Sequence, residues 1–184
     1  MVFAVAVISL WVARFGQNLA SPDWTRLTEL SWWAGTQIVA YLVLPLSVGA
    51  LIGLRPRDLG WSWRGIGAHW SLYGAIFAVA VPFVIVASST AAFQDQYPLL
   101  EVLPGQSDVF ADLARWWPLY ALQFVAIESF FRGFLVLGLA PRFGSMSVFV
   151  AVVPYMMIHF VKPPAEALAS VIGGLVLGFL ALRT

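Results

Sequence analysis

The chain has 184 residues, of which 61% are hydrophobic and only 10% are charged, and its formal net charge is +1. A soluble domain of this length could not bury that much apolar surface, whereas a lipid bilayer accepts it. The near-neutral charge gives no indication of nucleic-acid binding. The absence of cysteine excludes disulfides, cysteine-ligated metals and thiol catalysis. The composition therefore predicts an all-α, polytopic transmembrane helical bundle in which residues 1–184 form a single domain.

Six apolar segments are candidates for membrane helices, and the first lacks the basic start and the cleavage site of a signal peptide. Prolines inside such helices are tolerated when neighbouring groups satisfy the freed carbonyls. In chain order, the sequence predicts membrane helices at about residues 1–15, 30–54, 70–92, 116–139, 145–160 and 164–182.

The loops between these segments differ in charge. Arg55, Arg57 and Arg64 lie in one short loop, which the positive-inside tendency places in the cytoplasm. The loop 93–115 holds four acidic residues and one arginine, and its shortage of basic residues fits the outer side. Alternation of the helices then predicts that the N-terminus is cytoplasmic.

Two charged residues interrupt the fourth apolar segment. Glu128 and Arg132 lie near its middle, where a charge costs roughly 2.5–3.5 kcal/mol on insertion scales. Their i, i+4 spacing places both side chains on one helix face, within reach of each other. Ionisable residues at such depth are usually functional or paired, so this pair marks where the chemistry of the chain is expected.

A second polar group follows the fifth segment. Tyr155 and His159 again have i, i+4 spacing, and Lys162 and Glu166 flank a Pro-Pro break directly after them. A glutamate and a histidine in a dry site can exchange protons with water and with a leaving group. For Lys162 and Glu166 the structural interpretation is the stronger one, because a carboxylate suits the first turn of the following helix.

A purely structural interpretation of these residues stays open. Glu128 and Arg132 could be a buried ion pair and His159 a hydrogen-bonded core residue, since structural pairs also perturb pKa values. No metal site is predicted, because the chain has two histidines, His69 and His159, in different segments and no paired-histidine motif. No cofactor is expected.

At these residues the sequence resembles the CAAX-protease and bacteriocin-processing (CPBP, or Abi) family of intramembrane proteases. That family carries an EExxxR motif, an FxxxH motif and a late HxxxN or related motif. The stretch IESFFRGFL, with Glu128 and Arg132, matches the second glutamate and the arginine of the first motif. His159 matches the histidine of the second motif, with Tyr155 in place of phenylalanine. The resemblance covers residues 116–184.

The resemblance implies that Glu128 and His159 activate a water molecule for attack on a peptide bond and that Arg132 holds the carboxylate. The chain departs from the family at two points. Ile127 stands where the first glutamate is expected, and the third motif would follow Leu182, beyond the last residues of this sequence. Two alternatives remain: a truncated sequence, or a protein without the oxyanion-stabilising donors of that motif, whose loss typically costs about 10²–10³ in rate per donor.

These observations predict an intramembrane endopeptidase that hydrolyses a membrane-presented peptide with a Glu/His-activated water. The expected partners are the lipid bilayer and a membrane protein or peptide substrate, and the expected location is a bacterial inner membrane. One alternative is a catalytically inactive CPBP-like scaffold, immunity or chaperone subunit. Another is a small transporter lined by Gln123, Glu128 and Arg132, which the lack of internal repeats disfavours.

Overall fold

The computed structural model describes residues 1–62, 66–102 and 108–183, which fold into helices joined by turns and loops, without strands. The α-helices are α1 (Val2–Phe15), α2 (Arg26–Ile38), α3 (Leu44–Leu51), α4 (Trp70–Ser88), α5 (Ala91–Gln94), α6 (Val109–Glu128), α7 (Gly138–Phe143), α8 (Met146–Met157) and α9 (Pro164–Arg183). Three 3-10 turns are η1 (Gly16–Leu19), η3 (Pro56–Leu59) and η4 (Ile66–His69). Two π-helical segments, η2 (Val39–Val43) and η5 (Ser129–Leu137), continue α2 into α3 and α6 into α7. The predicted all-α class is confirmed.

Most of the predicted membrane helices appear as continuous helices of sufficient length. Among the described residues, five helical stretches are long and apolar enough to cross a membrane. They are Val2–Leu19, Arg26–Leu51, Gly67–Ser88, Val109–Phe143 and Pro164–Arg183. The remaining predicted span, 145–160, is the 12-residue apolar helix α8. After Met157 the backbone turns, and Pro164 begins α9.

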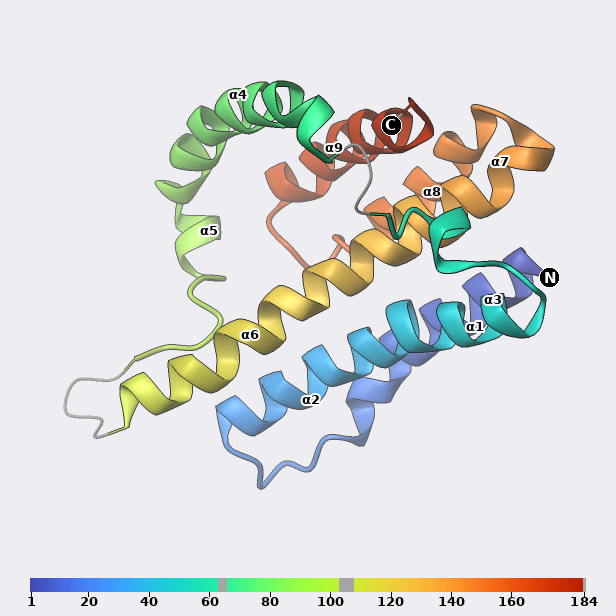
Figure 1. The fold of residues 1–184 in the computed structure, drawn as a ribbon. Helices are drawn as coiled ribbons and strands as arrows, with labels where there is room; N and C mark the ends of the chain where they lie inside the picture. The colour runs from blue at the N-terminus through green and yellow to red at the C-terminus, as the bar shows by residue number, and fades with distance from the viewer. Residues whose placement is uncertain (63–65, 103–107, 184) are drawn as a thin grey trace.

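One long helical rod organises the bundle. Figure 1 shows α6, η5 and α7 running diagonally through the molecule as one continuous path. Helix α2 packs along α6, whereas α8 and α9 pack against each other and against η5. The two π-helical segments meet in the core, where the ring centroids of Tyr41 and Phe130 are 4.9 Å apart. The segment Phe130–Val136 is buried at every position, so η5 is the centre of the fold.

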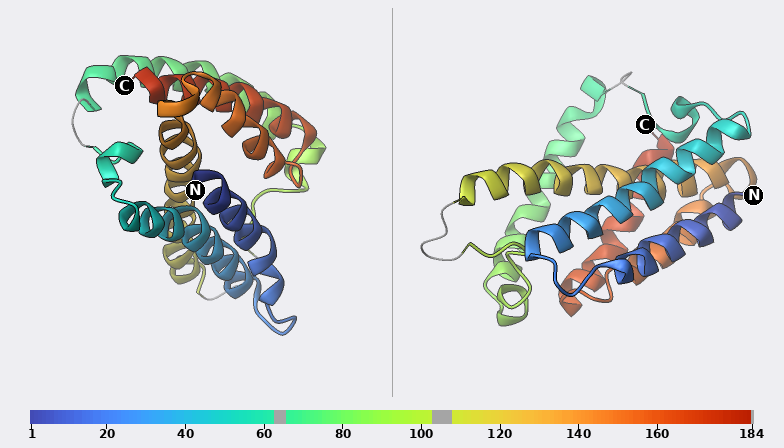
Figure 2. Two further views of the ribbon diagram at one scale, coloured as in Figure 1. Left: turned by 90° about the vertical axis from the view of Figure 1, so that its right-hand side faces the viewer. Right: turned by 90° about the horizontal axis from the view of Figure 1, so that it is seen from below.

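Helix α4 stands apart from this core. None of its residues is buried, and it arches over one side of the bundle in both figures (Figures 1 and 2). Its exposed side chains include Phe77, Phe83 and Val86, which suit contact with lipid rather than water. A membrane therefore supplies the apolar environment that the protein itself does not give to this helix.

The N-terminus, the α3–η3 corner and α7 lie at the same end of the bundle (Figure 1). This is the end that carries Arg55, Arg57 and Arg142, as the predicted alternation requires. The side of the membrane that this end faces stays a prediction, and Arg64 lies outside the described residues.

Candidate functional site

The pair predicted in the fourth apolar segment is present in the structure. Glu128 is the last residue of α6 and Arg132 lies in η5, with Arg132 Nε 3.2 Å from Glu128 Oε2. The two side chains differ in surroundings, because that of Arg132 is 10% exposed and that of Glu128 is 45% exposed. Arg132 therefore holds the carboxylate from the buried side, while the carboxylate itself faces an open space.

The guanidinium of Arg132 is packed against an aromatic ring. Its Cζ atom lies 4.1 Å from the centroid of the Tyr155 ring. Its three nitrogen atoms are buried and have no aligned hydrogen bond to any described residue. A cation over a ring face is stabilised by roughly 0.5–2 kcal/mol, more when it is desolvated. The charge of Arg132 is thus balanced by one carboxylate and one aromatic face.

Glu128 lines a cavity of about 790 Å³. The walls come from α6 and η5 on one side, from the η3 corner and the start of α4 on another, and from α9. The lining residues are Arg57, Asp58, Leu59, Gly60, Trp61, Ser62, His69, Tyr73, Phe124, Val125, Glu128, Ser129, Arg132, Gly133, Leu137, Leu177, Leu180 and Ala181. A cavity of this size, mainly apolar with a few polar groups, is typical of a ligand site.

The η3 corner reaches this cavity because it lies directly on η5. A Cβ atom at Gly133 would be 2.4 Å from the carbonyl oxygen of Leu59, so the close approach requires glycine at this position. The corner itself is held by Asp58, whose carboxylate accepts a hydrogen bond from the backbone N–H of Arg55 at 2.9 Å. It turns at Gly60, which has a φ of +83° that favours glycine.

His159 lies in the turn after α8, outside the stretches that could span a membrane. Its Nδ1 is 2.7 Å from the carbonyl oxygen of Tyr155. A carbonyl oxygen can only accept, so Nδ1 carries the hydrogen and Nε2 is the basic nitrogen of the neutral ring. Burial lowers the pKa of His159 below its ordinary value, which favours this neutral form.

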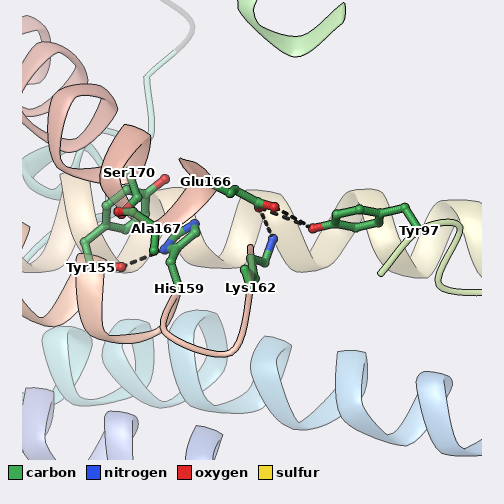
Figure 3. A network of polar contacts seen from close by, with 7 residues as sticks. All are labelled: Tyr97, Tyr155, His159, Lys162, Glu166, Ala167 and Ser170. Atoms are coloured by element: carbon green, nitrogen blue, oxygen red, sulfur yellow. Dashed lines mark hydrogen bonds and ion pairs between the residues drawn. The ribbon is translucent and has the colours of Figure 1, made fainter. Parts of the chain in front are cut away.

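A polar network lies on the other side of His159 and joins three parts of the chain (Figure 3). The Tyr97 hydroxyl is 2.9 and 3.2 Å from the two carboxylate oxygens of Glu166, and Lys162 donates to the same carboxylate at 2.5 Å. Burial raises the pKa of the Tyr97 phenol. Burial alone would lower the pKa of Lys162, but hydrogen bonds to Glu166 and Tyr97 raise it.

The predicted residues form a chain of contacts through the protein. Glu128 pairs with Arg132, Arg132 lies on Tyr155, and the rings of Tyr155 and His159 are 4.8 Å apart. No hydrogen bond or ion pair joins Glu128 to His159 directly. Ile127, at the position of the expected first glutamate, packs against the core.

Three features of the site were not predicted from the sequence: the cavity walls from the η3 corner, the presence of His69 in the cavity, and the hydrogen bond from Tyr97 to Glu166. Gly133 carried a signal for the first, because a glycine without a Cβ atom leaves room for a close approach of another segment. Within the described part of the chain, no group of three or more His, Asp or Glu residues could hold a metal ion.

Residues 110–184 match the family model described as type II CAAX prenyl endopeptidase Rce1-like. This region is similar to the CPBP family. The resemblance that the motifs indicated is therefore confirmed over residues that include Glu128, Arg132 and His159. Neither the curated proteins nor the solved structures compared with the chain include a match to it.

Proposed function

We propose that the protein is an intramembrane endopeptidase that hydrolyses a peptide presented by the membrane. The observation that supports this most strongly is the position of Glu128, whose carboxylate faces a 790 Å³ cavity while Arg132 holds it from behind. The family description, a CAAX prenyl endopeptidase, names the same reaction class. A prenylated peptide suits the cavity because Trp61, Phe124 and Leu177 give it apolar walls.

In this proposal Glu128 acts as the general base. It removes a proton from water, and the resulting hydroxide adds to the carbonyl carbon of the peptide bond. The proton taken up by Glu128 then passes to Nε2 of the neutral His159, and the imidazole gives it to the leaving nitrogen as the C–N bond breaks, so that Glu128 is again a carboxylate and His159 is again neutral. The products are a carboxylate and an amine. Arg132 keeps the carboxylate in place before and after each turnover.

Two features shape the assignment. Ile127 replaces the first glutamate of the family motif, so the proposal assigns the base to Glu128 alone. His159 is not among the residues that line the cavity, and Arg132 and Tyr155 lie between it and Glu128. The proposal therefore requires the bound water and peptide to reach from the carboxylate to the imidazole. We also propose that the α3–η3 end of the bundle is cytoplasmic and that the membrane is a bacterial inner membrane.

The test uses the whole chain purified in detergent and a prenylated CAAX peptide as the probe. We expect the parent protein to cleave it, and cleavage in ¹⁸O-labelled water to place one label in the new carboxylate. Glu128→Gln and His159→Ala should lower the rate by about 10²–10⁴, the usual contribution of general acid–base groups. Equal cleavage by all three proteins would rule out these roles.

The second candidate is a non-enzymatic membrane scaffold of the same family. It is favoured by the contact between Arg132 and Tyr155, which joins η5 to α8 and would serve structure alone. Removing one partner of a buried ion pair usually destabilises a fold strongly, because the other charge is left unpaired. A scaffold therefore predicts a large fall in the melting temperature of Glu128→Gln and no cleavage by the parent.

A further inference from the structure

The polar network beyond His159 connects a distant loop to the histidine. Tyr97 lies in the loop after α5, whereas Lys162 lies in the turn after α8 and Glu166 lies in the first turn of α9. The Tyr97 hydroxyl donates to the Glu166 carboxylate, and the Lys162 ammonium lies 5.8 Å from the centre of the Tyr97 ring. Figure 3 shows the three side chains meeting around the Glu166 carboxylate.

The same turn also carries the histidine. The backbone N–H of Lys162 donates to the carbonyl oxygen of His159 at 3.0 Å, so the two residues belong to one hydrogen-bonded turn. At its other side, the imidazole is fixed by the carbonyl of Tyr155. The imidazole of His159 is therefore fixed by α8, and the backbone of His159 is tied to the turn that carries Lys162, whose ammonium shares the Glu166 carboxylate with Tyr97.

We propose that Tyr97, Lys162 and Glu166 form a latch that positions His159, which makes Tyr97 a positioning residue of the proposed peptidase. The name latch refers to these three residues. Its catalytic meaning rests on the proposed role of His159. The latch would fix the turn and keep one positive and one negative charge at set distances from the imidazole, so that its proton affinity stays constant.

The charges that bear on His159 come from three elements. Lys162 lies in its own turn, Glu166 in α9 and Arg132 in η5, while Tyr155 in α8 contributes a carbonyl. Lys162 and Glu166 act on the imidazole with opposite signs. A latch that works through these charges can therefore be distinguished from one that only stabilises the fold.

The experiment follows the titration of the two imidazoles by NMR on histidine-labelled protein in detergent micelles, with His69→Gln to assign the signals. We expect Glu166→Gln to lower the pKa of His159 and Lys162→Met to raise it, each by about half a pH unit for a nearby, partly solvated charge. Shifts in the same direction would overturn the proposal, and this comparison leaves Tyr97 unchanged.

The role of Tyr97 is tested by repeating Glu166→Gln in two backgrounds. Tyr97→Phe removes the hydroxyl but keeps the ring, whose centroid lies 4.5 Å from that of the Phe93 ring. The matched control is Tyr120→Phe, since Tyr120 also lies within electrostatic reach of the pair but makes no described hydrogen bond to it.

In the Tyr97→Phe background we expect the shift in the His159 pKa caused by Glu166→Gln to fall to half or less of its value in the parent. In the Tyr120→Phe background the same shift should keep its full size. An equal shift in both backgrounds would show that Tyr97 does not position the pair. No substrate is used, so the outcome is independent of cleavage. If the shift depends on Tyr97 but the protein does not cleave the peptide, the proposed peptidase alone is contradicted. If the protein cleaves the peptide but the shift does not depend on Tyr97, the latch alone is contradicted.

Discussion

The guanidinium carbon of Arg132 lies over the ring of Tyr155, 4.1 Å from the centre of the ring. This contact joins η5, which carries Arg132, to α8, which carries Tyr155 and precedes His159. It explains why both i, i+4 pairs belong to one site although they lie on different helices. The aromatic ring at position 155 matters here for its face rather than for its hydroxyl.

Substitution of Tyr155 tests this interpretation. Tyr155→Phe keeps the ring face and should unfold with nearly the same free energy as the parent. Tyr155→Leu removes the ring and should lose about 0.5–2 kcal/mol from the cation–π contact, besides any loss of packing. The free energy of unfolding in detergent micelles is the measurement. Equal losses in the two variants would show that the ring face does not hold Arg132.

Gly133→Ala should destabilise the protein and disturb the cavity. The added methyl would lie 2.4 Å from the Leu59 carbonyl oxygen, which is backbone and cannot rotate away. Overpacking of this kind typically costs about 1–3 kcal/mol. Thermal unfolding in detergent measures the effect.

Gly173→Ala is the matched control, because nothing lies within 4 Å of a Cβ atom at that position in α9. It should unfold like the parent or slightly later, since alanine favours a helix over glycine by about 1 kcal/mol. A melting temperature of Gly133→Ala equal to that of Gly173→Ala would contradict the close approach of the η3 corner to η5.

The latch should weaken at alkaline pH. The folded-state pKa of Lys162 and that of Tyr97 are both raised, so each contributes stability that is complete below its unfolded pKa and is lost as pH rises through the folded pKa. The melting temperature should therefore begin to fall above about pH 10, where both groups titrate in the unfolded state, and should keep falling as pH rises through the raised folded-state pKa values. Lys162 is the only lysine of the chain, which limits the competing groups to tyrosines and the N-terminus.

Tyr97→Phe isolates the contribution of the latch to this alkaline transition. It removes one of the two groups that titrate, so the fall in melting temperature over the same pH interval should be smaller than in the parent. An unchanged fall would mean that Tyr97 keeps the same pKa in the folded and unfolded states, contrary to its buried contact with Glu166.

The two histidines can be compared as proton donors, because His69 lines the same cavity as Glu128 whereas the ring of His159 packs against that of Tyr155. We expect His159→Ala to abolish most cleavage of the prenylated peptide and His69→Ala to change mainly the KM. The steady-state constants of the two variants decide between them. The opposite pattern, with kcat lost only in His69→Ala, would transfer the proton-donating role to His69.

The sequence predicted the elements of this site because they are local. The Glu128–Arg132 pair follows from i, i+4 spacing within one helical stretch, and its cost in an apolar segment made it conspicuous. The apolar segments likewise marked the long helices, since bilayer thickness sets their length. The π-helical geometry of η5 was not predictable, because the same apolar pattern is compatible with a regular α-helix.

The remaining features depend on contacts between distant parts of the chain. Tyr97 and Glu166 are 69 residues apart, and no local pattern indicates that a loop tyrosine reaches the first turn of α9. The Leu59–Gly133 approach is of the same kind, because only the folded backbone shows which carbonyl the glycine accommodates. The cavity could not be predicted for the same reason, since its walls come from segments far apart in sequence.

The most direct test of the central claim is the initial rate of peptide cleavage by Glu128→Gln compared with that by Glu29→Gln. Glu29 is a matched control, since it pairs with Arg26 on a helix at 2.9 Å and lies away from the cavity. If Glu128 is the general base, Glu128→Gln should lose at least about 10²-fold in rate and Glu29→Gln should cleave like the parent. Cleavage by folded Glu128→Gln at the parental rate would contradict the account.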